Sequence, residues 1–387
     1  MELTLPGENS PTRIWVKDWI KSNPNATSKE LAQAGLVAPH WPKPYGLDAT
    51  PIDQLIIDEE LRGSGIKRPE NIIGIGWAGP TILHAGTKEQ KDRYLLPLLS
   101  GEEIWCQLFS EPDAGSDLAS LSTKAVQDGD DFIVNGQKIW TSMGHFAKFG
   151  ILLARTNSDV PKHQGISYFI LDMKSPGVRV TPIVDMTGMH TFNQVFFTDV
   201  RVPKDNLVGE LNKGWELAKV TLANERVSLS SGGSLWGRGP TSRDLIDLLR
   251  MFGGVNDPLI RQRVAEIYSE GEILKWLTLR QISKAIKGAQ PGYESSVKKA
   301  LGDEHGQKLM NLANDIAGMK GSLESLAGID STSDLSSAIT SWYYGFLFSA
   351  ALTIGGGTSE VQRNIIAERT FNLPKEFDAS SSKPFNS

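Results

Sequence analysis

One stretch decides the fold of this chain: Trp105-Cys106-Gln107-Leu108-Phe109-Ser110-Glu111-Pro112-Asp113-Ala114-Gly115-Ser116-Asp117-Leu118. An apolar run ends here and gives way to small, hydroxyl-bearing and acidic residues spaced by proline and glycine. Such a segment continues neither a helix nor a strand. Its backbone N–H groups and hydroxyls can instead point to one place, as in loops around phosphates and flavins. The alternative interpretation is an ordinary connection between a helical and a β-rich segment.

The composition is that of a large globular protein, because 40% of the 387 residues are hydrophobic and 22% are charged. A chain of this length can bury a large core and form two or three domains. The net charge of −5, without a basic block, argues against nucleic acid and an anionic membrane as partners. Cys106 is the only cysteine, so neither an internal disulfide nor a cysteine metal site can form. The six histidines show no metal-ligand spacing, and we predict no metal.

The sequence shows no signal for export or for membrane insertion. The first residues lack the apolar segment of a secretory signal. No run approaches the roughly 18 apolar residues that a membrane helix needs. We therefore expect a cytoplasmic protein.

The hydrophobic period changes twice along the chain. It is helical up to about Leu99, close to two in the region after the opening stretch, and helical again to Arg369. In the middle region, Asp128-Gly129 and Asn135-Gly136 have the sequence of hairpin turns. This order indicates segregated domains and an α+β fold. The predicted domains are an N-terminal helical domain (1–101), an antiparallel β-barrel or sandwich (102–205) and a C-terminal helical bundle (206–387).

One glycine motif matches a nucleotide-binding pattern without its context. Gly74-Ile75-Gly76-Trp77-Ala78-Gly79 has the G-x-G-x-x-G spacing. That spacing binds a dinucleotide only between a strand and a helix of a βαβ unit. The preceding residues do not form a strand pattern, and the following ones are helical. We therefore interpret these glycines as sites of close helix packing.

Three motifs, in order, resemble those of the acyl-CoA dehydrogenase family, and the resemblance covers the chain from the Trp41-Pro42 loop to Arg369. The first motif is Ser110-Glu111-Pro112-Asp113-Ala114-Gly115-Ser116-Asp117. The second is Asn135-Gly136-Gln137-Lys138-Ile139-Trp140-Thr141-Ser142, which looks like the family's hairpin beside the flavin. The third is Gly356-Gly357-Thr358-Ser359-Glu360-Val361-Gln362-Arg363, which looks like its C-terminal signature.

The resemblance implies a flavoprotein that binds FAD and oxidises an acyl-CoA thioester to the trans-2-enoyl-CoA. A base would remove the α-hydrogen as a proton, while the β-hydrogen leaves as hydride to flavin N5. The electrons would pass to an electron-transferring flavoprotein. Members of the family are usually tetramers with FAD at a subunit interface, so we expect a homotetramer, with a homodimer or a heterotetramer as alternatives.

The matching positions give a set of expected site residues. Trp140 would shield one side of the flavin ring, although most tryptophans at a strand end are simply core residues. Ser116, Arg226 and Gly356 are expected to contact the acyl-CoA. The expected FAD-binding residues are Gln107, Leu108, Phe109, Ser110, Gly115, Ser116, Trp140, Thr141, Ser142, Thr358 and Glu360. Thr358 or Ser359 can cap the last helix, Ser359 with Gln362 fits a capping box, and such a helix start favours a diphosphate.

The catalytic base requires a carboxylate in a dry site, because the thioester α-proton is weakly acidic. Many family members carry a glutamate just before the Gly-Thr of the third motif, but this chain has Gly356 there. A second branch, resembling isovaleryl- and long-chain acyl-CoA dehydrogenases, carries the base in a Glu-Arg pair on an earlier helix. Glu225-Arg226 occupies that position, so we predict Glu225 as the base. The alternative is a solvated Glu-Arg helix face, and Glu111 is interpreted as a structural turn residue.

Parts of the chain depart from the common family pattern. The usual Arg-x-x-Phe-Gly stretch has no clean match, since only Met251-Phe252-Gly253-Gly254 lies nearby. A serine-rich segment from Ser331 to Ser341 replaces the expected Gly-Gly-x-Gly loop. These differences resemble a bacterial branch that acts on bulky, branched or carboxylated acyl chains, including steroid side chains. Two other functions remain open at this point: a flavin oxidase or monooxygenase on the same scaffold, and a non-catalytic subunit of a heterotetramer.

Overall fold

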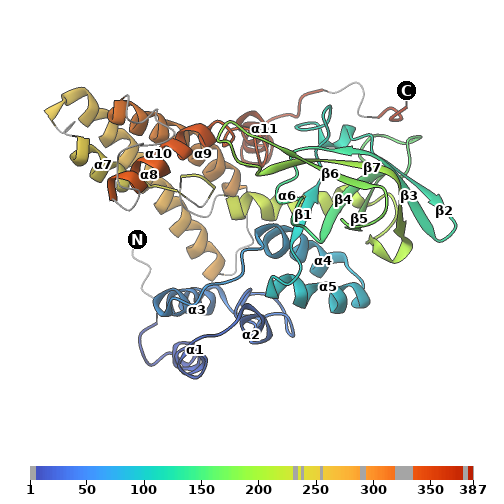
Figure 1. The fold of residues 1–387 in the computed structure, drawn as a ribbon, viewed down its shortest axis with the longest axis horizontal. Helices are drawn as coiled ribbons and strands as arrows, with labels where there is room; N and C mark the ends of the chain where they lie inside the picture. The colour runs from blue at the N-terminus through green and yellow to red at the C-terminus, as the bar shows by residue number, and fades with distance from the viewer. Residues whose placement is uncertain are drawn as a thin grey trace. The chain divides into compact units, whose positions relative to one another are not determined.

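The computed structural model describes residues 6–229, 234–236, 239–252, 256–287, 293–318, 334–377 and 382–386. These residues form two compact units (Figure 1). The larger unit contains residues 2–185, 190–224 and 377–387, and the smaller one contains residues 186–189 and 225–376. Among the described residues, no helix is long and apolar enough to cross a membrane. The predicted α+β class with helical, β and helical parts in chain order is confirmed, whereas the boundaries after residues 101 and 205 stay a prediction.

Three of the five N-terminal helices begin where a threonine side chain caps them. Thr27 and Thr87 each form a capping box with the residue three positions later, and Thr50 accepts a hydrogen bond from Asp53 N. Pro51 occupies the first turn of its helix, where its missing N–H group costs nothing. The helices are α1 (Pro11–Ser22), α2 (Ser28–Gln33), α3 (Pro51–Ser64), α4 (Gly79–Ala85) and α5 (Lys88–Ser100).

The glycine motif at residues 74–79 packs against its neighbours, as the sequence predicts. Residues Gly74–Ala78 form a π-helical turn that leads directly into α4. A Cβ atom on Gly79 would lie 2.3 Å from Cη2 of Trp41, and one on Gly74 would lie 2.4 Å from Nδ2 of Asn71. Both glycines are therefore needed for close approach within the helical part of the larger unit.

The middle of the chain forms an eight-stranded sheet. Its strands are β1 (Trp105–Leu108), β2 (Lys124–Asp128), β3 (Asp131–Lys138), β4 (Phe149–Arg155), β5 (Ile166–Asp172), β6 (Val178–Ile183), β7 (Phe192–Pro203) and β8 (Leu207–Val208). Their order is β6-β7-β3-β2-β4-β5-β8, with β1 beside β4. Most pairs are antiparallel, but β1 and β2 each pair with β4 in parallel. The burial of β4 and β5 on both faces explains their continuous apolar sequences.

The two predicted hairpin turns have different outcomes. Asp128-Gly129 lies between the paired strands β2 and β3, where Gly129 has a φ of +63°. The prediction for Asn135-Gly136 is wrong, because both residues lie inside β3 at an irregularity in its register with β7. A Cβ atom on Gly136 would come within 2.7 Å of Cα of Thr123, so a glycine is required by close backbone approach in a bulge.

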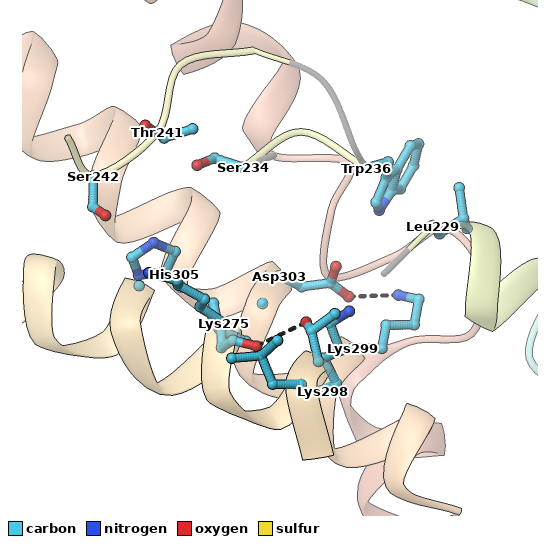
Figure 2. A pocket seen from close by; sticks show the side chains of 15 residues that line it. Leu229, Ser234, Trp236, Thr241, Ser242, Lys275, Lys298, Lys299, Asp303 and His305 are labelled. Atoms are coloured by element: carbon cyan, nitrogen blue, oxygen red, sulfur yellow. Dashed lines mark hydrogen bonds and ion pairs between the residues drawn. The ribbon is translucent and has the colours of Figure 1, made fainter. Parts of the chain in front are cut away.

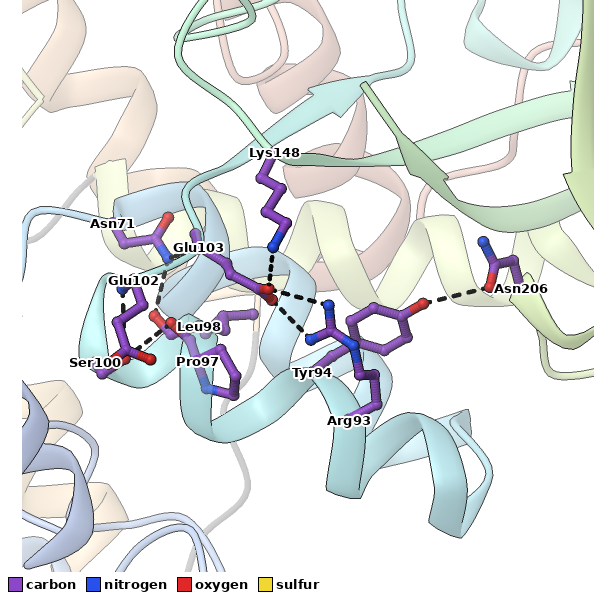
Figure 3. Close-up of polar contacts among 10 residues, drawn as sticks. All are labelled: Asn71, Arg93, Tyr94, Pro97, Leu98, Ser100, Glu102, Glu103, Lys148 and Asn206. Atoms are coloured by element: carbon purple, nitrogen blue, oxygen red, sulfur yellow. Dashed lines mark hydrogen bonds and ion pairs between the residues drawn. The ribbon is translucent and has the colours of Figure 1, made fainter. Parts of the chain in front are cut away.

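A polar cluster around the buried side chains of Asn71 and Glu103 connects α5 to the start of the sheet (Figure 3). The Glu103 carboxylate accepts two hydrogen bonds of 3.0 Å from Arg93 and one of 2.7 Å from Lys148. The Asn71 side chain donates to the carbonyls of Leu98 and Glu103, and its Oδ1 accepts from Trp105 N at 3.2 Å. These bonds fix the point at which the chain changes from helix to strand, directly before the opening stretch.

The smaller unit is a helical bundle built around one helix. Its elements are the end of α6 (Gly214–Leu229) from Glu225 on, α7 (Asp244–Phe252), α8 (Pro258–Ile286), α9 (Glu294–Ala317), α10 (Asp334–Ser349), α11 (Ser359–Ile365) and a π-helical turn at Ile366–Thr370. Helix α9 contacts α7, α8, α10 and α11, and its inner face is buried, as at Leu309, Met310 and Ala313.

The start of α11 differs in detail from the expected capping box. Thr358 is the N-cap residue, and its Oγ1 accepts a hydrogen bond of 3.2 Å from Val361 N. A capping box of Ser359 with Gln362 is therefore excluded, since Ser359 is already inside the helix. The Gln362 amide instead donates to the carbonyls of Gly356 and Gly357, both at 3.2 Å.

Replacing Gly79 by alanine tests the packing interpretation. The new Cβ would overlap the rigid Trp41 ring, so we expect the variant to lose about 1–3 kcal/mol of unfolding free energy in urea melts. The matched control is Gly63→Ala in α3, where a Cβ meets nothing within 4 Å. That change should stabilise the protein by about 0.5–1 kcal/mol. Equal effects of the two substitutions would contradict the assignment.

Candidate functional site in two groups of residues

The loop after β1 is held by a buried ion pair between Glu111 and Lys138. The two charged atoms, Oε1 and Nζ, are 2.8 Å apart, and both side chains are almost fully buried. Glu111 also accepts hydrogen bonds from Ser122 N at 2.7 Å and Thr123 N at 2.9 Å. Lys138 additionally donates to the Phe109 carbonyl at 2.9 Å. The pair therefore connects the first motif to the end of β3, which carries the second motif.

Both members of this pair are charged at neutral pH. Burial opposes the charged form of Glu111, but the Lys138 ammonium and the hydrogen-bond donors outweigh burial and lower the Glu111 pKa to about 2. Burial lowers the pKa of Lys138 to about 8, against the attraction of Glu111. A carboxylate held in this way is a poor proton acceptor, which agrees with the interpretation of Glu111 as structural.

The predicted residues of the first and second motifs lie close together. Ile139 N donates to the Ser110 carbonyl at 2.9 Å, directly joining the two stretches. Leu108 and Phe109 are buried, whereas Gly115 and Ser116 are exposed at the turn beyond Glu111. A Cβ on Gly115 would meet nothing within 4 Å. The backbone here is accessible to a ligand, while the residues behind it are fixed.

The segment after β3 presents an exposed aromatic side chain beside a buried hydroxyl. Trp140 has a φ of +61° and is 57% exposed, so it is not the strand-end core tryptophan of the alternative interpretation. Thr141 is fully buried, and its N–H group donates to the Asn193 carbonyl at 3.0 Å. Its Oγ1 atom has no hydrogen-bond partner among the described residues. Ser142, next to it, is half-buried.

The unpartnered hydroxyl and the exposed indole fit a flavin. A buried hydroxyl without a partner costs free energy unless a ligand supplies one. A flavin offers hydrogen-bonding atoms at its edge and an apolar ring face, which Thr141 and Trp140 could meet. The residues present therefore fit the cofactor that the motifs imply.

The second group of predicted residues surrounds Gly356 in the smaller unit. Glu225, on α6, is only 7% exposed. A Cβ atom built on Gly356 would lie 3.5 Å from its Oε1. The position that carries a glutamate in many relatives of this sequence type is therefore adjacent to the carboxylate that this chain places on α6.

The other predicted residues of this group differ in their environments. Arg226 is half-buried, and burial lowers its pKa against the opposing effect of Glu225. It forms no ion pair with any residue that the structure describes. Thr358 caps α11, and Glu360 is exposed in its first turn. A hydrogen bond to its own backbone N–H lowers the pKa of Glu360, with Thr358 adding to the effect.

Three residues of the site were missed from the sequence. Lys138 was quoted only as part of the second motif, although its ammonium holds both motifs together. Asn193 exchanges hydrogen bonds with Thr141 from a distant strand, through its carbonyl and its Nδ2. Lys299 places its Cε 2.9 Å from a Cβ on Gly356. Only Lys138 had a sequence signal, since a lysine in a buried strand needs a carboxylate partner.

Comparison with known proteins identifies the family. Family models match the acyl-CoA dehydrogenase N-terminal domain at residues 12–102, the middle domain at 106–200 and the C-terminal domain at 212–371. Acyl-CoA dehydrogenase IpdE1 of Mycobacterium tuberculosis is 36% identical over 91% of this chain and 88% of its own length. The chain belongs to the acyl-CoA dehydrogenase family, whose members are FAD-dependent oxidoreductases.

Two further similarities are to a longer relative and to a solved structure. Acyl-CoA dehydrogenase FadE34 of Mycobacterium tuberculosis is 41% identical over 89% of this chain, but the chain spans only 46% of that relative's length. A solved structure named Tcur3481-Tcur3483 steroid ACAD has a TM-score of 0.77 and 28% identity, covering 97% of this chain and 100% of its own. Among the described residues, no group of three or more His, Cys, Asp or Glu could hold a metal.

Replacing Lys138 by methionine should be strongly destabilising, because it leaves Glu111 buried without its counterion. Removing one partner of a buried pair costs about 3–5 kcal/mol. In the wild type, the contribution of Glu111 to the free energy of unfolding is fully present above its ordinary pKa of 4.5 and is lost as the pH falls toward about 2. In the variant burial is no longer opposed by Lys138, so the Glu111 pKa rises and the loss of unfolding free energy on acidification should be smaller than in the wild type, as measured by urea unfolding across an acid series. The exposed neighbour Lys124 gives the control, and Lys124→Met should stay within about 0.5 kcal/mol.

Replacing Thr141 by valine tests the role of its unpartnered hydroxyl. If the hydroxyl bonds FAD, affinity for FAD in fluorescence titrations of stripped protein should fall roughly tenfold, with little change in the stability of the stripped protein. The contrast is Thr81→Val, because Thr81 Oγ1 is bonded to Thr221 at 2.8 Å. That variant should lose about 1 kcal/mol of stability and bind FAD normally. Unchanged FAD affinity in Thr141→Val would remove this residue from the site.

Proposed function

We propose that this chain is an acyl-CoA dehydrogenase in which Glu225 is the general base. The reaction breaks the Cα–H and Cβ–H bonds of an acyl-CoA thioester and forms a trans-2-enoyl-CoA. Glu225 takes the α-hydrogen as a proton. FAD, when bound, supplies the acceptor for the β-hydrogen and its electron pair at N5.

The observation that carries this proposal is the position of the Glu225 carboxylate. It is buried, which favours a strong base toward a weakly acidic carbon. It is adjacent to Gly356, which itself cannot act as a base. The alternative of a solvated Glu-Arg helix face does not fit a carboxylate that is 7% exposed.

Residues of the larger unit have supporting roles in this proposal. The backbone and hydroxyl groups from Gln107 to Ser110 and at Gly115 and Ser116 bind the flavin edge. Thr141 and Ser142 donate hydrogen bonds to the ring, and Trp140 covers it and excludes water and oxygen. Thr358 and Glu360 contact FAD, whereas Ser116, Arg226 and Gly356 contact the acyl-CoA.

The partners follow from the same proposal. An electron-transferring flavoprotein accepts the electrons, and the chain assembles as a homotetramer, a homodimer or a heterotetramer. We place the enzyme in the bacterial cytoplasm, which the similarity to FadE34 and IpdE1 of Mycobacterium tuberculosis supports. The similarity to a steroid ACAD supports a bulky acyl group.

Replacing Glu225 by glutamine tests the base directly. The amide cannot accept the α-proton, so the rate of flavin bleaching by a reactive acyl-CoA under anaerobic conditions should fall about 10²–10⁴-fold. FAD content, measured by absorbance, should stay that of the wild type. The matched control is Glu216→Gln on the same helix, because Glu216 is exposed and pairs only with Lys219 on the surface; it should retain full activity.

Other results would select the alternatives. Full activity in Glu225→Gln would show that another group is the base. Rapid peroxide release by the reduced wild-type enzyme in air would indicate an oxidase. A chain that binds no FAD when purified alone, but does so with a second chain, would be a subunit of a heteromer.

A further inference from the structure

Three side chains of the smaller unit meet at the place where Gly356 has none. A Cβ atom built on Gly356 would lie 3.5 Å from Oε1 of Glu225 and 2.9 Å from Cε of Lys299. The same Cβ would lie 2.5 Å from Cδ1 of Leu229. Leu229 follows Glu225 by one turn of α6, whereas Lys299 belongs to α9. The proposed base and the methylene next to the Lys299 ammonium therefore lie close to one point.

Lys299 forms an ion pair with Asp303, which lies one turn further along α9 (Figure 2). Both side chains are almost fully buried, and both line a cavity of about 320 Å³. Burial raises the pKa of Asp303 to about 6, against the attraction of Lys299. Asp303 is therefore ionised above about pH 6 and neutral below it, so the negative charge that opposes Lys299 depends on pH.

Other charged residues of α6, α9 and α11 have different surroundings. Arg226 follows Glu225 on α6 and is half-buried, and burial lowers its pKa against the opposing effect of Glu225. Lys298 precedes Lys299 on α9, is buried, and lines the same cavity. The residues that pair with one another or with Glu270 of α8 are Glu304, His305, Lys308, Glu360 and Arg363. In the described part of the chain, Lys299 is the cation nearest to the Cβ position of Gly356.

A carboxylate base in a dry site depends on a balance between two effects. Burial disfavours the charged form, so a buried glutamate without a nearby cation would be protonated and could not accept a proton. An unopposed ammonium nearby has the reverse effect, because it stabilises the carboxylate and makes it a weaker base. A buried lysine that is itself paired with an acid exerts an intermediate effect. Lys299 with Asp303 is such a pair, and its cation is the end that lies beside Gly356.

We propose that Lys299 and Asp303 are positioning residues that set the charge of the catalytic base. The Lys299 ammonium keeps the Glu225 carboxylate ionised until it receives the α-proton of the substrate, and Asp303 limits this attraction so that the carboxylate stays basic. Neither residue contacts the reacting atoms in this scheme. The inference rests on the proposed function, since it explains how the same base is kept ready for the same proton transfer.

The test follows the protonation of Glu225 directly. Infrared difference spectra of each FAD-loaded protein against the same protein with Glu225→Gln report the protonated fraction of this carboxyl across a pH series. Lys299→Met should move the midpoint up by about 1–2 pH units. Asp303→Asn should act in the opposite direction: above about pH 6, the protonated fraction should be smaller than in the wild type, because Lys299 is no longer opposed. The pH profile of anaerobic flavin reduction by an acyl-CoA should move with each titration.

Two further variants separate this effect from a loss of folding. Lys299→Met combined with Asp303→Asn leaves neither member of the pair as an unpaired buried charge, and its midpoint should still lie above that of the wild type. Lys308→Met removes a partly exposed lysine of α9 that pairs with Glu270, and it should leave the midpoint unchanged.

The outcomes distinguish the two proposals. Midpoints equal to that of the wild type in Lys299→Met and in the double variant would overturn the role of the pair, as would shifts of the same sign in Lys299→Met and Asp303→Asn. Infrared midpoints that move while the pH profile of flavin reduction stays fixed would instead contradict Glu225 as the base, and with it the proposed function.

Discussion

The ion pair of Glu111 and Lys138 is the constraint on which the larger unit's candidate site depends. Two opposite charges are buried behind a loop that must expose its own backbone to a ligand. A loop that offers N–H groups to a cofactor cannot use them to stabilise itself. Contacts to the residues packed behind the loop must therefore fix its position. The carboxylate provides this by accepting bonds from Ser122 and Thr123, and the ammonium by donating to the Phe109 carbonyl. The most conspicuous acid of the motif is thus used for geometry.

The smaller unit contains the carboxylate that we propose as the base. Gly356 and Glu225 belong to distant parts of the chain, yet the built Cβ position of one lies 3.5 Å from the carboxylate of the other. Gly356 has a φ of +67°, and Leu229 occupies the space next to it. A side chain at 356 would be strained in backbone conformation and would overlap Leu229. A side chain at 356 would therefore require Leu229 to move.

The sequence patterns predicted the structure correctly where local rules decide it. Periodicity placed the helical, β-rich and helical parts of the chain in the right order, and the Gly74–Gly79 segment was correctly separated from a nucleotide loop. The predictions were wrong where a residue distant in the sequence determines the local structure. Asn135-Gly136 has the composition of a turn, but it lies at a bulge in β3, where Gly136 packs closely against Thr123, the residue before β2. The capping box at Ser359 failed by one residue, because the amide of Gln362 donates to the two glycine carbonyls instead. The partners of Lys138 depend on the tertiary fold and leave no trace in the spacing of residues.

The cavity of the smaller unit that Lys298 and Lys299 line has a consequence for how such a protein can change in evolution. Helix α9 contributes Lys298 and Lys299 on one side, but it also contacts four other helices of the bundle. Substitutions on the faces of α9 that pack against those helices would alter the shape of the cavity and the stability of the bundle together. Ser234, Thr241 and Ser242 line the same pocket from outside the helices. New pocket shapes can therefore arise by drift in this connecting segment, while the scaffold that carries the charged residues is inherited unchanged.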